Sequence, residues 1–301
     1  MNCSDARKEI LRIVSQVEPR ELPSLLEWLK HSDDLDDCIH DNNKVILKSI
    51  ADDLRSCLPL EAVLSSESLT IQKTMQNPRP TVHVDAFLYD DKAVDALCEE
   101  GKMSSNYCLG CGSHSTAPLD FISHSFSIPE LQFIFQQVLP DLTGRLVVDV
   151  GSRLGAVLYG GYLYSSAARL VGVEISTEFV HLQNMAVEKY GFSDRIEVIH
   201  ADICSQVSLL QETDVLIMNN VFEYFLHPSD QIKAWDCIRQ HFRKREALLL
   251  TVPSIRDSLT KLKINNVVDI SGWVEEVCLN YDKYRKCDPD SLKEIHLYRV
   301  L

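Results

Sequence analysis

The sequence predicts an α/β fold in which a mostly parallel β-sheet carries helices on both faces and follows a smaller helical module. Two observations support this. From Arg145 onward, short apolar segments rich in β-branched residues alternate with helical segments, as in parallel sheets buried on both faces. Earlier segments are mainly amphipathic and helical. We therefore expect a helical module at 1–102, a loop or lid at 103–126 and the sheet domain at 127–301.

The expected module begins with three amphipathic helices. In residues 5–17 apolar side chains recur at helical spacing, and we expect Ser4 to cap this helix and Pro19 to stop it. Residues 25–29 and 44–58 repeat the amphipathic pattern. An acidic segment of low hydrophobicity separates the last two helices, so it adds little to a core.

The second part of the module and the loop have weaker patterns. Residues 81–89 favour a short strand, and residues 90–101 favour a helix that Gly101 closes at the C′ position. The polar, turn-rich stretch at 104–127 has no clear period. A loop of this length inside a compact chain is typically functional or mobile, so we expect it to fold over a ligand, with Tyr107 and Phe126 in contact.

The same loop contains a C-x-x-C pair, Cys108 and Cys111, with His114, His124 and Cys98 nearby. Four such side chains have the chemistry of a zinc site. A zinc ribbon would show two C-x-x-C pairs, and this chain has one. We therefore predict no metal and keep zinc as an alternative.

The expected sheet domain has strong signals throughout. A capping box formed by Ser127 and Glu130 predicts a helix at 128–139. Strands are then expected at 146–150, 169–174, 195–201, 214–220, 247–252 and, at the end of the chain, 294–301. Helices are expected at 155–167, 177–190 and 229–243. This order predicts a ligand site at the carboxyl edge of the sheet, where strand order reverses.

Composition narrows the class of protein. The chain has 301 residues, is 45% hydrophobic and has a formal net charge of −14. It shows no export signal and no apolar run long enough to span a membrane, so we expect a protein of the cytoplasm or nucleus with reduced cysteines. The acidity opposes non-specific binding to phosphate backbones.

The turn after the first expected strand is the stretch D-V-G-S-R-L-G, from Asp149 to Gly155. Glycine in such a turn lets the backbone approach a ligand, and the following helix presents free N–H groups. Gly151 and Gly155 give G-x-x-x-G instead of the dinucleotide pattern G-x-G-x-x-G, and Arg153 stands where a glycine is expected. This signal is weak by itself.

Polar residues at the ends of later strands strengthen the evidence for a ligand site at this turn. Glu174 ends the second strand, where a carboxylate can accept both hydroxyls of a ribose. Asp202 follows the third strand and is placed to accept from an adenine amine, and Asn219 and Asn220 end the fourth. The pattern predicts a nucleoside site that binds a hydroxylated ribose and needs no phosphate.

These motifs, DVGSRLG, GVE, ADI and IMNNVFEYF, resemble those of class I S-adenosylmethionine-dependent methyltransferases, which have a Rossmann-like fold. The likeness covers about residues 127–301. It implies S-adenosyl-L-methionine as cofactor, held by Asp149, Gly151, Ser152, Gly155, Glu174, Ile175, Asp202, Ile203 and Asn219. In this reading Glu174 binds the ribose, Asp202 the adenine, and Asn219 faces the methyl group. Arg153 departs from the family pattern.

A fainter resemblance links NNVFEYF and the capped helix FSIPELQFIF to the non-SET histone-lysine methyltransferases. It implies methylation of a protein nitrogen, a lysine-type amine first, with catalytic residues Asn219, Asn220, Phe222 and Tyr224. Phe222 and Phe225 fit core packing equally well. RNA or a small metabolite is an alternative acceptor. Arg153 also keeps open a non-catalytic, activating subunit, whereas the missing G-x-G-x-x-G disfavours a nicotinamide dehydrogenase.

Overall fold

The chain forms two compact units, Met1–Ile46 and Leu47–Leu301. The computed structural model describes residues 3–31, 41–60, 62, 64, 81–104, 106–108, 116–118, 120–223, 225–262, 270, 272–281 and 289–301. The first boundary differs from the expected end of the helical module at residue 102. Helix α4 (Asn42–Ser56) buries Leu47, Ile50 and Leu54 in the second unit, and residues beyond it contact the glycine loop of the sheet domain.

The first unit contains α1 (Cys3–Val14) and α2 (Leu22–His31). Both helices are expected from the sequence. Helix α1 begins before Ser4, so that residue lies inside the helix and the prediction that it caps the helix is wrong. Ile10, Leu11 and Ile13 of α1 are exposed.

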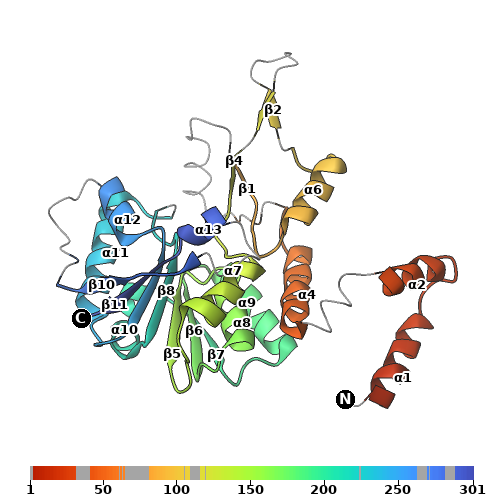
Figure 1. Ribbon diagram of the computed structural model, residues 1–301, viewed down its shortest axis with the longest axis horizontal. Helices are drawn as coiled ribbons and strands as arrows, with labels where there is room; N and C mark the ends of the chain where they lie inside the picture. Colours follow the sequence, from red (N-terminus) through yellow and green to blue (C-terminus); the bar gives the residue numbers. More distant parts are fainter. Residues whose placement is uncertain are drawn as a thin grey trace. The chain divides into compact units, whose positions relative to one another are not determined.

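A seven-stranded sheet organises the second unit, and its order is β10-β11-β9-β8-β5-β6-β7 (Figure 1). The strands are β5 (Leu146–Val150), β6 (Arg169–Glu174), β7 (Ile196–His200), β8 (Val215–Asn219), β9 (Leu248–Val252), β10 (Val274–Val277) and β11 (His296–Val300). β5 to β9 are parallel, and β11 is antiparallel to β9 and β10. The predicted mostly parallel, Rossmann-like sheet is confirmed. β10 is a strand that the sequence analysis missed.

Helices cover both faces of this sheet, as predicted. Figure 1 shows α8 (Ala156–Tyr164) and α9 (Thr177–Tyr190) on one face, and α10 (Val207–Glu212), α11 (Pro228–His241) and α12 (Ile255–Lys261) on the other. Successive strand residues point to opposite faces. Thus Val148 and Leu216 pack with Trp235 of α11, whereas Asp149 lies on the α8 face with its register partner Gly172.

The helix before the sheet starts where the sequence predicts. Ser127 accepts from the backbone of Glu130, whose side chain accepts from the backbone of Ser127, so the capping box is confirmed. The α-helix itself, α7 (Ile128–Phe133), is short. It continues as the π-helical turn η2 (Ile134–Val138), which ends near the predicted boundary.

Smaller elements lie between α4 and α7. They are β1 (Thr81–His83), α6 (Asp91–Glu99), β2 (Asn106–Cys108), β3 (Thr116–Pro118) and β4 (Asp120–Ile122). β1 pairs in parallel with β4, and β2 pairs with β3. The expected strand 81–89 ends early because the side chain of Asp85 accepts from the backbone N–H groups of Phe87 and Leu88, which forms a turn.

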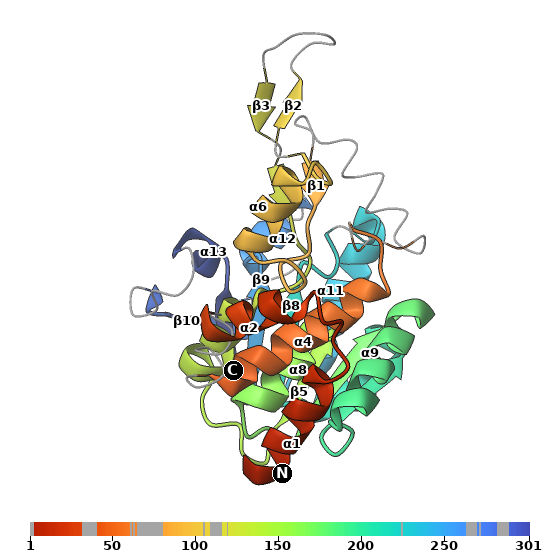
Figure 2. The ribbon, with the colours of Figure 1, turned by 90° about the vertical axis from the view of Figure 1, so that its right-hand side faces the viewer.

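Helix α4 lies against the helical layer formed by α8 and α9, as Figures 1 and 2 agree. Asp53 of α4 accepts from Lys189 Nζ at 2.6 Å and from the Tyr190 hydroxyl at 2.7 Å, both at the end of α9. The remaining described elements are the 3-10 turn η3 (Ile203–Ser205) and α13 (Pro289–Lys293). None of the described helices has the length and apolarity that a membrane crossing requires.

Candidate active site

A cavity of about 750 Å³ opens at the carboxyl edge of the parallel strands. Its wall includes the last residues of three strands, Val150 of β5, Glu174 of β6 and Asn219 of β8. β5 pairs with both β6 and β8, so strand order reverses here. Ligands of open α/β sheets bind at this kind of switch point, and the volume suits a small organic ligand.

The glycine loop between β5 and α8 is tightly fitted. Gly151 has φ +67°, and a Cβ atom there would lie 2.5 Å from Cγ2 of Val221. Gly155 has φ +81°, and its Cβ would lie 2.7 Å from the ring of Tyr159. Side chains are therefore excluded at both positions for conformational and steric reasons. Ser152 is buried and donates to Gln183 Oε1 at 2.8 Å, which anchors the loop to α9.

Glu174 is buried in the cavity wall. Its two oxygens accept from backbone N–H groups, of Arg153 at 2.9 Å and of Ser176 at 2.8 Å. Burial raises the pKa of this carboxyl, and the backbone hydrogen bonds oppose that rise. A carboxylate has about four lone-pair sites, so Glu174 retains acceptor capacity for two ribose hydroxyls.

Asp149 lies below the cavity. It is buried on the α8 face and does not line the cavity. Burial raises its pKa well above the ordinary range, and the neighbouring Glu174 raises it further. Three other predicted residues, Ser152, Gly155 and Asn220, also lie outside the lining. Their assignment to the site stays a prediction, in which Ser152 and Gly155 act by shaping the loop.

One end of the cavity, the Asp202 end, is formed by Asp202, Ile203 and Ile175. Asp202 is exposed, and its side chain accepts from the backbone N–H of Cys204 at 2.8 Å, which fixes its orientation at the start of η3. Ile203 is buried, whereas Ile175 is 69% exposed. This part of the lining therefore combines an acceptor with two apolar side chains, which suits a planar base that carries an amine.

The opposite end, the Asn219 end, is formed by Asn219, Phe222, Phe225 and His124. Asn219 Nδ2 donates to the His124 carbonyl at 3.5 Å, and Asn219 Oδ1 accepts from Asn220 at 3.1 Å. The Phe225 ring meets the His124 ring edge-on, with centroids 5.1 Å apart. This end combines an amide with a largely apolar wall.

Phe222 has both roles that the sequence left open. It is buried against Trp235, with ring centroids 5.6 Å apart, and it also lines the cavity. Phe225 is half-buried in the same wall. Tyr224, the remaining predicted catalytic residue, lies outside the described residues. Glu223, next to Phe222, is half-buried and accepts from the Ser258 hydroxyl.

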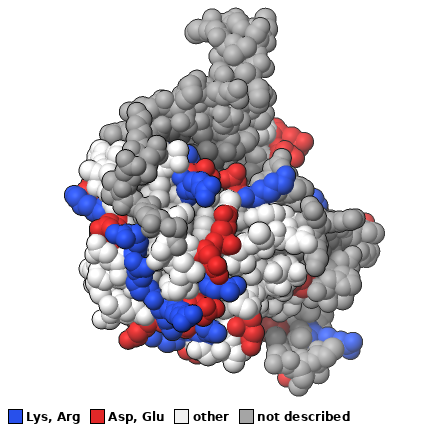
Figure 3. Space-filling view, turned by 60° about the vertical axis from the view of Figure 1, so that its left-hand side comes forward, with Lys and Arg blue, Asp and Glu red and all other residues white. Residues whose placement is uncertain are grey.

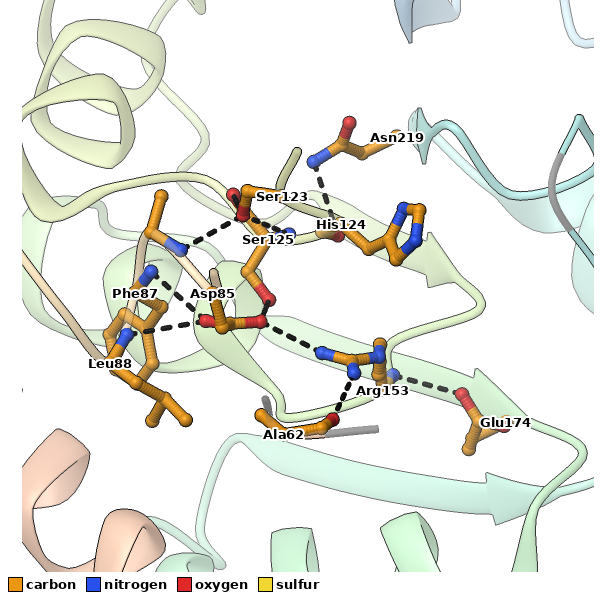
Figure 4. Close-up of polar contacts among 11 residues, drawn as sticks. Ala62, Asp85, Phe87, Leu88, Ser123, His124, Ser125, Arg153, Glu174 and Asn219 are labelled. Carbon is orange, nitrogen blue, oxygen red and sulfur yellow. Dashed lines mark hydrogen bonds and ion pairs between the residues drawn. The ribbon is translucent and has the colours of Figure 1, made fainter. Parts of the chain in front are cut away.

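Arg153 is the main feature that the sequence analysis did not place. Its guanidinium donates to Asp85 Oδ2 at 2.8 Å and to the Ala62 carbonyl, and it lies 4.9 Å from the ring centroid of Phe179 (Figure 4). Ser125 also donates to Asp85, at 2.6 Å. The side chains of Arg153 and Asp85 are 6% and 0% exposed. The motif shows the substitution at Arg153 but carries no signal for its partners.

His124 is a second lining residue that the sequence placed elsewhere, among the possible zinc ligands. It is buried and stacks on His83 with ring centroids 4.8 Å apart. Burial lowers its pKa well below the ordinary value, and the nearby His83 and Arg153 lower it further. The imidazole is therefore neutral near pH 7.

Of the other possible zinc ligands, Cys98 lies in α6 as a free cysteine. Cys111 and His114 lie outside the described residues, as does the side chain of Cys108. Within the described part of the chain, no three His, Cys, Asp or Glu side chains come together as a metal site would require. Phe126, a predicted ligand contact, is buried and does not line the cavity.

The cavity fits S-adenosyl-L-methionine in both chemistry and size. Glu174 suits the ribose, Asp202 the adenine amine, and the cradle at Gly151 leaves no room for a side chain. Residues 148–250 match the family model described as a methyltransferase domain. The chain therefore contains a class I S-adenosylmethionine-dependent methyltransferase domain, and S-adenosyl-L-methionine is its cofactor.

Solved structures with distant similarity include several methyltransferases. One from Geobacter sulfurreducens is 15% identical, with 81% of this chain and 100% of that chain covered and a TM-score of 0.39. An O-methyltransferase from Bacillus cereus, in complex with SAH, is 13% identical and has a TM-score of 0.40, and the match covers 60% of this chain and 84% of that chain. An RNA methyltransferase from Salinibacter ruber, in complex with S-adenosyl-L-homocysteine, is 16% identical and has a TM-score of 0.33, and the match covers 52% of this chain and 78% of that chain. No curated protein matches the sequence.

Proposed function

We propose that this methyltransferase methylates a nitrogen of a protein side chain, and that a lysine-type amine is its acceptor. The Asn219 end of the cavity supports the proposal. It presents one amide, from Asn219, among the apolar or neutral rings of Phe222, Phe225 and His124. An amine must be uncharged to attack, and surroundings of this kind disfavour the ammonium form.

Methyl transfer is an in-line displacement, so the protein mainly aligns the acceptor and excludes water. A bond forms between the amine lone pair and the methyl carbon, and the S–C bond breaks with its electrons left on sulfur. Asn219 Oδ1, which already accepts from Asn220, has a second lone pair that can accept an amine hydrogen and orient the nitrogen. Phe222 and Phe225 narrow the approach to an unbranched chain.

Surface charge favours a basic protein over free RNA as the acceptor. The chain carries a formal charge of −14, which disfavours contact with a phosphate backbone. Figure 3 shows a run of Lys and Arg side chains on one face with Asp and Glu side chains beside it. Ion pairs of this kind include Lys244 and Arg145, which both contact Asp214. Paired cations are poorer ligands for phosphate.

The test is transfer of label from methyl-labelled S-adenosylmethionine to fractionated cell extract. We expect label in material that protease releases and nuclease does not, and methylated lysine after acid hydrolysis. Label in RNA or in the small-molecule fraction would overturn the proposal in favour of those acceptors. Cofactor binding without any labelled acceptor would favour the activating-subunit alternative.

A variant at Asn219 tests the site itself. We expect Asn219→Ala to reduce turnover by about tenfold or more while S-adenosylhomocysteine binding changes less than about threefold, since the lost hydrogen bond orients only the acceptor. Asn184→Ala, on the exposed surface of α9, is the matched control. Equal turnover in the two variants would remove Asn219 from the mechanism.

A further inference from the structure

Two cysteines line the cavity near Asp202, and neither takes part in methyl transfer as proposed. Cys204 lies in the turn η3, and Cys237 lies in α11. Both are free thiols, and both residues are half-buried. A cavity that admits a cofactor also admits a small solute, so a dissolved oxidant can reach this pair.

The two cysteines are in contact although they belong to different elements. The Cys237 thiol donates to the backbone carbonyl of Cys204 at 3.9 Å. The turn η3 and the helix α11 pack against each other, which keeps the two residues together. A disulfide requires Cα atoms within about 7 Å of each other. A sulfur atom that touches the backbone of the other cysteine is compatible with this requirement.

Cys204 also connects this pair to the cofactor site. Its backbone N–H donates to Asp202 Oδ1 at 2.8 Å, and its carbonyl accepts from the Cys237 thiol. The Asp202 carboxylate is the acceptor that suits the adenine amine of the cofactor. A displacement of Cys204 toward α11 would therefore move the N–H group that orients this carboxylate.

We propose that Cys204 and Cys237 form an oxidation site, at which a peroxide converts the two thiols into a disulfide that weakens cofactor binding. The disulfide ties η3 to α11 and draws Cys204 away from Asp202. Reduction by a thiol breaks the S–S bond and restores the orientation of the carboxylate. Cofactor binding then depends on the redox state of the surroundings.

The oxidation takes place in two steps and consumes one molecule of hydrogen peroxide. In the first step, the Cys237 sulfur attacks a peroxide oxygen, the O–O bond breaks, and a sulfenic acid and water are formed. In the second step, the Cys204 sulfur attacks the sulfenic sulfur, and the hydroxyl group leaves with the thiol proton as water. The two sulfur atoms together lose two electrons, which the peroxide gains.

The surroundings of Cys204 set the order of these steps. Burial raises the pKa of the Cys204 thiol, and the neighbouring Cys237 raises it further, so Cys204 keeps its proton near pH 7. The thiolate is the nucleophile that attacks an oxidant. We therefore assign the first step to Cys237, and Cys204 condenses with the sulfenic acid.

The test uses the wild-type chain, first fully reduced and then treated with an equimolar amount of hydrogen peroxide. Mass spectrometry of alkylated peptides identifies the linked cysteines, and calorimetry measures S-adenosylhomocysteine binding. We expect a peptide pair that joins Cys204 to Cys237 and an affinity lowered by about tenfold, the scale of one hydrogen bond to a charged group. Dithiothreitol should restore the affinity. Absence of this linkage, or unchanged affinity of the linked protein, would overturn the proposal.

Variants assign the effect to this pair of thiols. Cys204→Ser and Cys237→Ser each remove one thiol and keep a side chain of similar size. We expect peroxide treatment to change the affinity of either variant by less than about twofold, since neither can form the disulfide. Cys57→Ser is the matched control, because Cys57 is exposed and follows α4, and it should lose affinity as the wild type does. An equal loss in Cys237→Ser and wild type would place the oxidation elsewhere and overturn the proposal.

The reduction potential provides a second measurement that needs no substitution. If the disulfide weakens binding tenfold, a ligand that saturates both forms favours the dithiol by the same factor. In glutathione redox buffers, we therefore expect a potential more positive by about 30 mV with S-adenosylhomocysteine than without it. An unchanged potential would show that the disulfide and the ligand are independent, and would overturn the proposal. The acceptor does not enter these measurements, so they are independent of the proposed function.

Discussion

The cavity has two walls built on different principles. The sheet wall consists of residues that end strands or follow them within two positions, Gly151, Glu174, Asp202 and Asn219. The second wall, which we call the cap wall, consists of the lining residues His124 and Arg153. Asp85 and Ala62 do not line the cavity but accept from the Arg153 guanidinium. The sheet wall supplies what nucleoside binding requires. The cap wall adds a buried ion pair and the stacked ring of His124.

The walls also differ in how they are stabilised. The sheet wall depends on backbone geometry, with glycines at positive φ and N–H groups that fix one carboxylate. The cap wall depends on an ion pair between side chains that are 6% and 0% exposed. Removing one partner of a buried pair leaves an uncompensated charge. We therefore expect the cap wall to be the more fragile of the two.

Asp85→Asn tests this fragility and has the largest expected effect. We expect the free energy of unfolding to fall by about 3–5 kcal/mol, because the buried Arg153 charge loses the carboxylate of Asp85. Urea unfolding measures it. Asp90→Asn is the control, because Asp90 caps the exposed start of α6 and asparagine caps almost equally well. A loss below about 1 kcal/mol would mean that the two walls do not differ in this respect.

Glu174→Ala tests the sheet wall. We expect S-adenosylhomocysteine binding to weaken by about 100-fold, since two charge-assisted hydrogen bonds to the ribose are lost. Calorimetry measures the change, with circular dichroism to check that the loop and fold remain. Glu197→Ala is the control, because Glu197 is exposed on β7 and pairs with Arg169. Comparable affinities in the two variants would remove Glu174 from the ribose site.

The sheet wall could be predicted from the sequence because its signals are local. Each acid follows an apolar segment within a residue or two, and the strands and the capping box at Ser127 were found where the patterns indicated. The predicted bounds of helices and strands were wrong where a local interaction competed with the pattern. The turn at Asp85 shortened the expected strand, and α1 begins before the cap expected at Ser4.

The cap wall could not be predicted because its contacts join distant parts of the chain. Arg153 meets Asp85 across 68 positions and Ala62 across 91. No periodicity or motif reports such a pairing. The sequence showed only that Arg153 departs from the family pattern, which left its meaning open. The pairing also brings residues expected in a helical module into contact with Arg153, which lines the cavity.

A pair of glycine variants tests the sheet wall further, and the expected effects on stability are of intermediate size. Gly151 and Gly191 have similar φ angles, +67° and +71°. A Cβ atom added at Gly151 would lie 2.5 Å from Val221, whereas a Cβ atom added at Gly191 would have no neighbouring atom within 4 Å. We expect Gly191→Ala to cost about 1 kcal/mol of stability from strain alone. Gly151→Ala should cost about 2 kcal/mol or more and also weaken cofactor binding. Equal costs would mean that the loop at Gly151 can move away from Val221.

The smallest effect on stability is expected outside both walls, where Asp53 links α4 to α9. Hydrogen bonds from Lys189 and Tyr190 lower the pKa of Asp53 below its ordinary range. A carboxyl whose pKa is lower in the folded state stabilises that state above its unfolded pKa, near 3.9, and this contribution is lost as the pH falls through the folded pKa. The side chain of Asp53 is 32% exposed and that of Lys189 is 58% exposed, so solvent screens their interaction.

We therefore expect Asp53→Asn to cost about 0.5 kcal/mol at pH 7, which is the scale of an exposed ion pair. The difference from wild type should shrink as the pH falls through the lowered folded-state pKa of Asp53, because wild-type Asp53 then becomes protonated as well. Urea unfolding between pH 7 and pH 2.5 measures both. Asp52→Asn, on the same helix with a side chain 62% exposed, is the control. A cost that persists unchanged at low pH would show that Asp53 acts through packing and not through its charge.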